Sequence, residues 1–340
     1  MAETLKIVVP MAGWGTRMRP HTWSKPKPLV SVAGKSALEH LMDGFKTLPD
    51  PKHTEYVFIV GPYLGETQIP KFIAETYPDI TAHYVVQAEM KGQSHALYLA
   101  RQYLTGPTLI IFSDTLIDAN FSFLDWEKSN VVAWVKPVPD PRRFGVAEVN
   151  DDGWVRRFIE KPEGMENNLV VVGCYYFQRG EDLMAAIEEQ FNRDVQLKNE
   201  FFLTDAISIM IEHGALVRTE TVDTWLDTGT IDATLETNRI LLGKLEVEPG
   251  RRERVEIREP VFIHESAQVE NSVIGPDVSI GADCQIKDCA IEDSIIEPGC
   301  EIKDAALTHS FIGVGAKVQG RGAGDSPISL NVGDHSDVRC

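Results

Sequence analysis

The hydrophobic residues of the N-terminal third form short, mainly β-branched runs separated by amphipathic stretches. Such runs predict buried strands, and apolar residues spaced three and four positions apart predict helices. The predicted strands cover residues 5–9, 55–60, 82–87 and 108–112, and the predicted helices cover 36–46, 68–77 and 94–103. Strands that alternate with helices indicate an α/β fold with a parallel sheet, whose ligands bind at the carboxyl ends of the strands.

From residue 131 onward the pattern changes to short strands separated by turn residues, which predicts an inserted antiparallel segment. The predicted strands cover residues 131–136, 145–149, 155–159 and 170–177. Helical periodicity returns over residues 181–191, 204–213 and 231–245. Thr204 and Asp205 stand at the start of one of these helices, and we expect them to cap it.

A third pattern begins beyond residue 260, where an apolar residue recurs every five or six positions. The recurring residues are Ile263, Val269, Ile274, Ile280, Ile286, Ile291, Ile296, Ile302, Leu307, Ile312 and Val318. This hexapeptide-like period predicts a left-handed parallel β-helix of about three coils. Cys284 and Cys300 occupy small inward positions of the repeat, so packing explains them. The predicted organisation is an α/β domain at 1–248, a linker at 249–260, the β-helix at 261–320 and a tail at 321–340.

Composition and charge narrow the possible functions. The chain has 340 residues, of which 43% are hydrophobic and 25% charged, as in an ordinary globular protein. Its formal net charge of -18 argues against a nucleic-acid or anionic membrane partner, which would need a basic surface. We find neither an 18-residue apolar run nor a secretory signal. The five cysteines include no C-x-x-C pair, so we expect reduced thiols and a cytoplasmic location.

The residues after the first strand indicate a site for a polyphosphate. Gly13 and Gly15 let backbone N–H groups approach an anion closely, because no Cβ blocks the approach. Arg17 can hold phosphate oxygens in a bidentate fork. Lys25 and Lys27 are each followed by proline, which should keep them extended and hold their ammonium groups in place. A polyanion bound to this acidic chain must be met by such local cations and by metal ions.

Two common phosphate loops do not match this stretch. The dinucleotide fingerprint needs a third small residue where this chain has Met18, and the Walker A pattern is absent. The pattern Gly13-x-Gly15-Thr16-Arg17-x-x-Pro20-x-Thr22, followed by Lys25-Pro-Lys27-Pro, instead resembles the motif of the sugar-1-phosphate nucleotidyltransferases, also called nucleotide-sugar pyrophosphorylases. The resemblance covers about residues 5–245. It extends to the β-helix and to Gly333-Asp-His-Ser336, as in the long-form glucose-1-phosphate thymidylyltransferase branch.

The resemblance implies a Rossmann-like mixed-sheet nucleotidyltransferase domain at 1–248, followed by the left-handed β-helix. It also implies Mg²⁺-dependent transfer from dTTP or UTP to a sugar 1-phosphate, with glucose 1-phosphate favoured, and release of pyrophosphate. The implied catalytic cations are Arg17 and Lys27. The implied nucleotide-binding residues are Ala12, Gly13, Gly15, Thr16, Gln87 and Gly92. The implied sugar-phosphate residues are Gly145, Glu160, Lys161, Gly173 and Glu200, and the implied metal ligands are Asp114 and Asp227.

Several of these residues have an ordinary structural alternative. Asp114 or Asp227 alone could cap a helix, although paired carboxylates beside phosphates suit Mg²⁺. Lys161 could be a solvated surface lysine, and glycine in a strand is often a bulge. The Gln87 amide offers one acceptor and two donors, a set that can pair with N3–H and O4 of thymine or uracil.

The β-helix also leaves alternatives open. Its histidines His264, His309 and His335 raise the possibility of an acyltransferase, because β-helix acyltransferases use a histidine. β-Helices also serve as oligomerising spines, which we favour, and we therefore expect a homo-oligomer. A catalytically inactive scaffold or regulatory subunit is another alternative. The intact set of Arg17, Lys27, Asp114, Lys161 and Asp227 argues against that scaffold.

Overall fold

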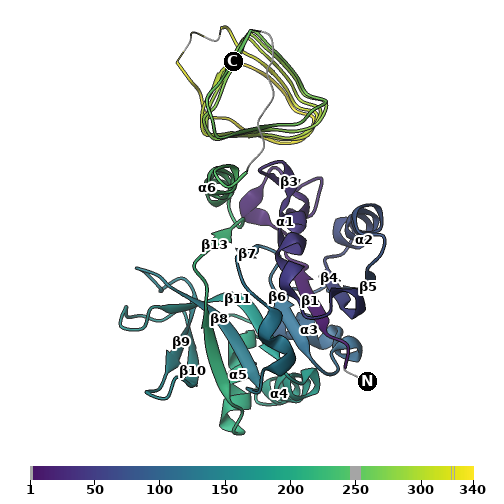
Figure 1. Ribbon diagram of the computed structural model, residues 1–340, viewed down its shortest axis with the longest axis vertical. Coiled ribbons are helices and arrows are strands. Elements are labelled where there is room, and N and C mark those ends of the chain that lie inside the picture. Colours follow the sequence, from purple (N-terminus) through teal and green to yellow (C-terminus); the bar gives the residue numbers. More distant parts are fainter. Residues whose placement is uncertain (1–2, 246–253, 323, 325) are drawn as a thin grey trace. The chain divides into compact units, whose positions relative to one another are not determined.

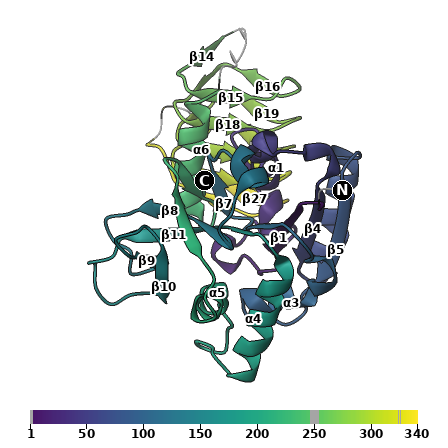
Figure 2. The ribbon, with the colours of Figure 1, turned by 60° about the horizontal axis from the view of Figure 1, so that its bottom comes forward.

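The computed structural model describes residues 3–245, 254–322, 324 and 326–340. The chain forms two compact units. Unit 1 contains the described residues up to Gly13 together with Leu41–Trp225, and unit 2 contains Trp14–His40 together with the described residues of Leu226–Cys340. The predicted domain boundary at residue 248 and residues 249–253 of the predicted linker lie outside the described residues. Figures 1 and 2 show the elements in two views.

Unit 1 is built on a nine-stranded mixed sheet with the order β10-β9-β11-β6-β1-β4-β5, to which β8 and β12 are added beside β11. The strands are β1 (Lys6–Met11), β4 (Glu55–Val60), β5 (Thr81–Val86), β6 (Thr108–Ile111), β8 (Val131–Pro137), β9 (Gly145–Val149), β10 (Val155–Glu160), β11 (Leu169–Phe177) and β12 (Val217–Thr221). Strands β5, β4, β1 and β6 run parallel, and β11 joins β6 in the antiparallel sense. The mixed sheet is therefore confirmed, and the predicted antiparallel insertion continues this same sheet.

Helices cover the sheet of unit 1 where its strands alternate with amphipathic stretches (Figure 1). They are α2 (Leu64–Thr76), α3 (Gln93–Leu99), α4 (Gly180–Asn192) and α5 (Leu203–Glu212), with short 3-10 turns at η3 (Gly44–Thr47), η4 (Pro51–His53), η5 (Arg101–Tyr103) and η6 (Ser122–Trp126). Leu97, Leu183 and Ile207 from three helices share one buried core with Val8 and Tyr175 of the sheet. No helix among the described residues is long and apolar enough to cross a membrane.

The C-terminal part of unit 2 is a parallel β-helix whose section is triangular (Figure 1). Its first side contains β14 (Val255–Ile257), β17 (Ser272–Ile274), β20 (Ala290–Ile291) and β23 (Ala306–Leu307). The second contains β15 (Val261–Ile263), β18 (Val278–Ile280), β21 (Ser294–Ile296), β24 (Ser310–Ile312) and β26 (Asn331–Val332). The third contains β16 (Gln268–Glu270), β19 (Gln285–Lys287), β22 (Glu301–Lys303), β25 (Lys317–Gln319) and β27 (Asp337–Arg339).

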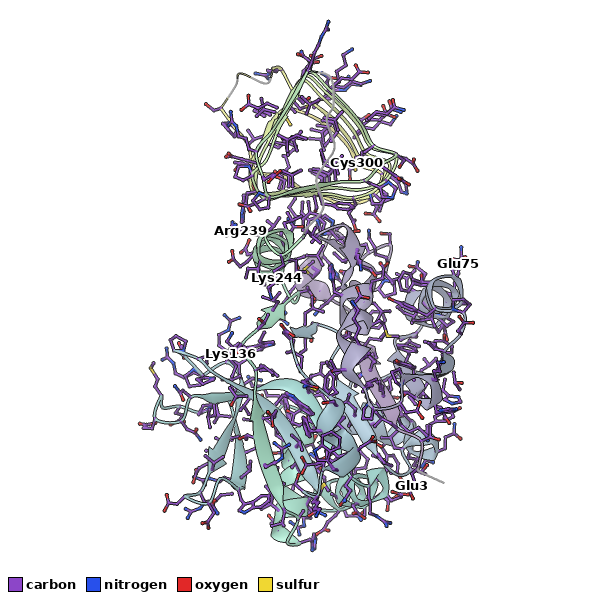
Figure 3. All side chains as sticks on the ribbon, in the orientation of Figure 1. Glu3, Glu75, Lys136, Arg239, Lys244 and Cys300 are labelled. Atoms are coloured by element: carbon purple, nitrogen blue, oxygen red, sulfur yellow. The ribbon has the colours of Figure 1, made fainter. Side chains whose placement is uncertain are left out.

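The interior of the β-helix confirms the predicted repeat and corrects its length. All eleven recurring apolar residues lie in its core, together with Cys284 and Cys300, the latter labelled inside the prism in Figure 3. Two of the three sides contain five strands each, so the helix is longer than the predicted three coils. The predicted linker contributes β14 and the predicted tail contributes β26 and β27. The last two strands were missed because Val332 lies 14 residues after Val318, which breaks the period. Ile257 of β14 lies six residues before Ile263 and continues the period, so the predicted repeat began one strand too late.

The outward residues of the second and third sides differ in character. On the third side they are mostly charged or amide residues, such as Glu301 and Lys317, which pair at 2.7 Å and face solvent. On the second side the central outward positions form a ladder that we call the platform. The platform residues are Phe262, Ser279, Ile295, Phe311 and Asn331. Because Ile295 and Phe311 have no exposed surface, other chain segments must cover this side.

The segment Trp14–His40 and helix α6 (Ile231–Leu242) cover the platform within unit 2. The segment contains η1 (Thr16–Met18), η2 (Lys27–Leu29), β2 (Ser31–Val32) and β3 (Lys35–Ser36), and α1 (Ala37–Asp43) and β13 (Trp225–Asp227) cross the division between the units. Met18, Val30 and Leu235 form one buried cluster with Ile295 and Phe311. The platform is therefore an internal packing surface of this unit.

A histidine at one corner of the β-helix joins that corner to α6. His309 Nδ1 lies 2.8 Å from Asp293 Oδ2, and its Nε2 lies 3.3 Å from Asp232 Oδ1 on α6. Arg239, labelled in Figure 3, adds a contact of 2.9 Å from α6 to Asp293. The hydrogen bond to Asp293 raises the pKa of His309 above its ordinary value, because the protonated ring is the better donor.

We expect His309→Gln to flatten the dependence of thermal stability on pH. The folded state binds the His309 proton more tightly than the unfolded chain does, because the folded pKa is raised. This stabilisation is complete below a pH of about 6.5 and is lost as the pH rises through the folded-state pKa. Between pH 6 and 8.5 the Tm of the wild type should thus fall more than that of the variant. His213→Gln, on an exposed ion pair of unit 1, serves as the control, and equal slopes in His309→Gln and wild type would refute the linkage.

Candidate active site

The carboxyl ends of the parallel strands in unit 1 bring several of the predicted site residues to one edge of the sheet. Met11 pairs in register with Val60, and Val60 pairs with Val86, so the residues after these strands are aligned. Ala12 follows β1, Gln87 follows β5, and Asp114 follows β6 after a two-residue turn. Ligands of parallel sheets bind at this edge. The sheet thus brings Ala12, Gln87 and Asp114 to this edge.

Gln87 is almost completely buried, and its amide is held by local contacts. The backbone N–H of Gln87 donates to Val60 O at 2.9 Å, which fixes the residue against β4. Its Nε2 donates to Gly92 O at 3.2 Å and lies 3.3 Å from His95 Nδ1. Burial lowers the pKa of His95, which favours the neutral ring that can accept this hydrogen bond. The side chain therefore has one fixed orientation.

Gly92 allows two distant segments to approach each other. It adopts φ +94°, and a Cβ atom there would lie 2.5 Å from both N and O of Phe201. Backbone bonds of 2.9 Å from Phe201 to Lys91 and 3.1 Å from Ser94 to Phe201 join the segments on either side. The candidate base-binding residues are thus tied to the Phe201-Phe202 segment, a link that the local sequence pattern did not indicate.

Three of the five predicted sugar-phosphate residues, Gly145, Glu160 and Lys161, form a connected cluster beside that segment. Gly145 and Glu160 are paired on β9 and β10, and a Cβ on Gly145 would lie 3.0 Å from Glu160 Oε2. Lys161 has φ +49°, and its N–H donates to Phe144 O at 3.0 Å. Its ammonium group lies 3.7 Å from Glu160 Oε1 and 5.2 Å from the centre of the Phe202 ring. The local backbone therefore holds the Lys161 cation over this cluster.

Asp205 belongs to the same cluster, and the sequence analysis gave it another role. Burial raises the pKa of Glu160, and the nearby Asp205 raises it further while Lys161 opposes the shift. Burial also raises the pKa of Asp205. The predicted caps are wrong, because α5 begins at Leu203 after Phe202 without a side-chain cap, and Thr204 Oγ1 is buried without a hydrogen-bond partner among the described residues. Two carboxyl groups with raised pKa values and a buried hydroxyl are suited to sugar hydroxyl groups.

Glu200 lies outside this cluster in the described contacts. Its side chain is exposed, and its backbone closes a turn with Leu197 through bonds of 3.0 and 3.1 Å. The turn residues Lys198 and Asn199 both have positive φ angles, of 53° and 64°. The predicted sugar-binding role of Glu200 therefore stays a prediction. The additional carboxylate near Glu160 is that of Asp205.

Gly173 shapes the turn that carries Asp114. It has φ +83° at an irregular point of β11, and a Cβ there would lie 2.7 Å from the Phe112 ring. Phe112 N donates to Gly173 O at 2.9 Å, and Thr115 Oγ1 donates to Val172 O at 2.8 Å. These contacts hold both ends of the Phe112–Thr115 turn, and Asp114 lies half-buried within it. Gly173 thus supports Asp114 as well as being a candidate for the sugar site.

The phosphate loop continues into unit 2, where Gly15 fixes its shape. Gly15 has φ +58°, and a Cβ there would lie 3.0 Å from Thr22 Cγ2 and 3.1 Å from Lys27 Cβ. Thr22 Oγ1 donates to Gly15 O at 2.8 Å, and the turn η1 follows with Thr16 and Arg17 exposed. A Cβ on Gly13, by contrast, would meet nothing within 4 Å. Local packing therefore requires glycine at position 15 and leaves position 13 open.

Two expectations about the lysines of this loop are wrong. Lys27 begins the 3-10 turn η2, in which Val30 N donates to Lys27 O at 3.0 Å, so it is not extended. Lys25 makes an ion pair with Glu297 of the β-helix and lies 3.7 Å from Asp334 Oδ1. The charge of Lys25 is therefore compensated by carboxylates, and Arg17 and Lys27 remain the candidate phosphate-binding cations of the motif.

Asp227 lies close to Arg17 within unit 2. Asp227 Oδ1 accepts the N–H of Gly229 at 2.6 Å, and Arg17 Nη2 lies 3.4 Å from the position that a Gly229 Cβ would take. Thr228 lies between Asp227 and Gly229 in the sequence, and its Oγ1 is buried without a hydrogen-bond partner among the described residues. The structure thus brings together the predicted catalytic arginine and one predicted metal ligand. The glycine at position 229 leaves room for the guanidinium group.

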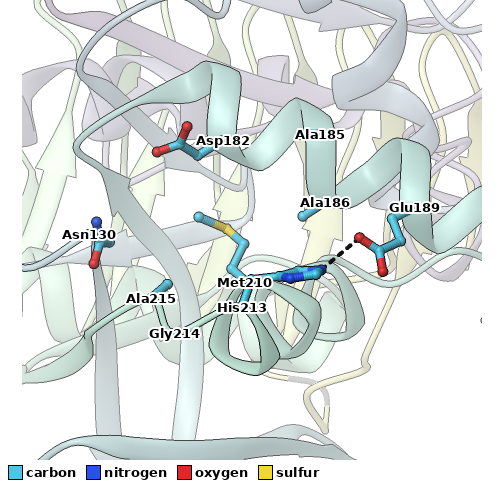
Figure 4. A pocket seen from close by; sticks show the side chains of 9 residues that line it. All are labelled: Asn130, Asp182, Ala185, Ala186, Glu189, Met210, His213, Gly214 and Ala215. Atoms are coloured by element: carbon cyan, nitrogen blue, oxygen red, sulfur yellow. Dashed lines mark hydrogen bonds and ion pairs between the residues drawn. The ribbon is translucent and has the colours of Figure 1, made fainter.

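Other places that could hold a ligand contain none of the predicted site residues. A cavity of about 420 Å³ lies beside α4 and α5, with Glu189 and His213 paired at its rim (Figure 4). His264 contacts Ser266, and His309 is bonded to two carboxylates. Within the described residues, His21, Glu297 and Asp334 could in principle hold a metal, but Lys25 occupies both carboxylates.

Comparison with known sequences identifies related proteins over most of the chain. Residues 6–244 match the family described as Nucleotidyl transferase, and residues 257–323 match the GMPPB C-terminal domain. Glucose-1-phosphate thymidylyltransferase of Streptomyces antibioticus is 31% identical over 322 residues, which cover 86% of this chain and 87% of that protein. Bifunctional protein GlmU of Methanocaldococcus jannaschii is 30% identical over 265 residues, which cover 77% of this chain and 61% of that protein.

Solved structures give a matching fold at lower sequence identity. UDP-glucose pyrophosphorylase complexed with UDP-glucose superposes with a TM-score of 0.59 at 20% identity, covering 72% of this chain and 100% of that one. A nucleoside-diphosphate-sugar pyrophosphorylase from Vibrio cholerae gives 0.60 at 20% identity, with coverage of 68% and 99%. At this level of identity the two comparisons support the fold alone.

We expect Gly92→Ala to destabilise unit 1 more than Gly214→Ala does. Both glycines have similar positive φ angles, +94° and +89°, but only the Gly92 Cβ would collide with backbone, while that of Gly214 would meet nothing within 4 Å. The backbone strain should be shared by both variants, so the difference isolates the contact with Phe201. Chemical unfolding should show an additional loss of about 1–3 kcal/mol in Gly92→Ala. Equal stabilities of the Gly92→Ala and Gly214→Ala variants would contradict this prediction, because the Phe201 segment would then move aside without a loss of stability.

Proposed function

The chain belongs to the Nucleotidyl transferase family, and we propose that it transfers a nucleotidyl group from a nucleoside triphosphate to a sugar 1-phosphate. The products would be pyrophosphate and a nucleoside diphosphate sugar. The observation that carries this proposal is the set of contacts that runs from Gln87 through Gly92 and the Phe201-Phe202 segment to Lys161. One edge of the sheet thereby combines a buried amide suited to a base with a cation suited to a sugar phosphate.

The proposed reaction needs charge compensation and alignment more than proton transfer. The sugar phosphate oxygen that attacks the α-phosphorus is already anionic near neutral pH, so no general base is required. Lys161 would bind the attacking phosphate, since its backbone conformation holds the ammonium group beside Phe202. Arg17 and Lys27 would bind the triphosphate and compensate the charge of the leaving pyrophosphate. Gly13, Gly15 and Thr16 would offer backbone N–H groups to the same phosphates.

The carboxyl groups beside Lys161 would orient the sugar. Glu160 is largely buried and has a raised pKa, as does Asp205. Carboxyl groups in such surroundings form strong hydrogen bonds to hydroxyl groups that replace water. Gly145 would leave space for the sugar ring at this position, because any side chain there would contact Glu160. Glucose 1-phosphate is the first sugar to test.

We propose Asp114 and Asp227 as ligands of Mg²⁺. The donor set fits magnesium, because hard carboxylate oxygens with water and substrate phosphates complete its octahedron. Asp227 is held by the Gly229 N–H and Asp114 by the Phe112–Thr115 turn. When bound, the ion would supply further positive charge to the α-phosphate. The assignment of Mg²⁺ to these two residues stays a proposal. The homo-oligomer that we expected from the β-helix also stays a proposal.

For the base we propose a pyrimidine, dTTP or UTP. The Gln87 Nε2 group is engaged by Gly92 O and His95 Nδ1, so the amide oxygen is the atom directed to the substrate. An amide oxygen accepts the N3–H of thymine or uracil, whereas cytosine has an acceptor at N3 and would be repelled.

The test is pyrophosphate release from dTTP, UTP, CTP, ATP and GTP with several sugar 1-phosphates. We expect dTTP or UTP to be used well above CTP, purines to be poor, and EDTA to abolish turnover. Gln87→Met should lower kcat/KM for the preferred nucleotide by roughly 10- to 100-fold, as for the loss of one buried hydrogen bond. Gln102→Met, at an exposed position of η5, is the matched control. A strong preference for ATP or GTP would refute the base assignment, and turnover in EDTA would refute the metal.

A further inference from the structure

A carboxylate without any exposed surface stands where the β-helix meets the phosphate loop. Glu297 follows β21 and has 0% exposed side-chain surface, while its partner Lys25 has 11%. One Glu297 oxygen binds the Lys25 ammonium group, and the other accepts the N–H of Ser31 at 3.2 Å. An unpaired buried carboxylate is very costly. Lys25 and Ser31 are therefore strongly constrained to stay at Glu297.

Contacts on both sides of Lys25 hold the same stretch of chain to the β-helix. The His21 ring stacks on Phe311 with 4.0 Å between ring centres, and its Nε2 lies 2.6 Å from Asn331 Oδ1. The Ser24 hydroxyl donates to Asp334, which also lies near Lys25. Together with the buried Met18 and with Ser31, these contacts hold the stretch at intervals from position 18 to position 31.

The two proposed catalytic cations are close in sequence to the residues that hold this stretch. Arg17 precedes the fully buried Met18 and is exposed. Lys27 lies two residues after Lys25 and begins the turn that ends beside the buried Val30. The side chains that enter the β-helix therefore determine where the neighbouring cations are held. A displacement of about 1 Å in such a group can cost roughly 100-fold in rate.

We propose that Glu297 is a positioning residue for the nucleotidyl transfer, acting through Lys25 and Ser31 on Arg17 and Lys27. This inference rests on the proposed function of the loop. It gives the β-helix a part in catalysis that differs from that of an oligomerising spine or a separate acyltransferase. If Glu297 had a structural role alone, the activity of its variants would follow their stability. If Glu297 is a positioning residue, kcat changes independently of stability and of KM.

The experiment compares Glu297→Gln, Lys25→Met and the double variant with wild type. Glu301→Gln is the matched control, because Glu301 lies four residues later and pairs with Lys317 in solvent. In each single variant we expect kcat to fall by about 10- to 100-fold with KM changed less than about threefold. The double variant removes both charges of the Glu297–Lys25 pair, and Asp334 keeps its hydrogen bonds from the Ser24 hydroxyl and the Val314 N–H. Its Tm should therefore recover above that of Lys25→Met while kcat stays low. Recovery of kcat together with Tm, or an unchanged kcat in Glu297→Gln, would overturn the proposal.

A second readout does not depend on turnover. Trypsin should cleave after Arg17 faster in Glu297→Gln than in Glu301→Gln, as measured by mass spectrometry of the fragment that ends at Arg17. Faster cleavage is expected because the loop loses its anchor while the β-helix stays folded. Equal cleavage rates would overturn the anchoring by Glu297. A wild-type chain that turns over no substrate pair would overturn the proposed function, and the cleavage comparison would still decide the anchoring.

Discussion

The buried ion pair between Glu297 and Lys25 is the constraint on which the arrangement of unit 2 depends. A carboxylate that is fully removed from water requires a counter-charge. Among the described residues, the ion-pair partner of Glu297 is Lys25. The pair spans 272 residues of sequence. It links the start of the chain to the β-helix, and the apolar cluster of Met18 and Phe311 surrounds the link. Neither the loop nor the platform can be rearranged without separating this pair or exposing that cluster.

The proposed site residues are divided between the two units in a way that the order of the sequence does not suggest. The first strand and the residues for base and sugar phosphate belong to unit 1, whereas Arg17, Lys27 and Asp227 belong to unit 2 with the β-helix. A motif that is continuous in sequence is therefore divided between two compact bodies. Its glycines differ accordingly, since Gly15 is required by contacts within unit 2 and Gly13 is unconstrained by packing. Each unit therefore holds its own share of the proposed site residues through its own core.

Sequence patterns predicted the elements and the inward residues, because periods of two, 3.6 and six directly reflect burial. They missed what depends on outward residues and distant partners. The period of the β-helix identified Ile296 and Ile312 as inward but could not indicate that Ile295 and Phe311 beside them are covered. Lys25 resembled another phosphate cation because its partner carboxylate is remote. Asp205 resembled a helix cap because only the folded chain brings it near Glu160.

The central claim is that the segment Trp14–His40 is stabilised as part of the β-helix. Native-state hydrogen exchange of wild-type protein at increasing denaturant, read by peptide, measures this most directly. The account predicts that amides of residues 16–31 lose protection at the same denaturant concentration as β21 and β24, whatever the stability of the sheet in unit 1. Loss of protection in residues 16–31 while β21 and β24 stay protected, or together with β1 and β4 instead, would contradict it.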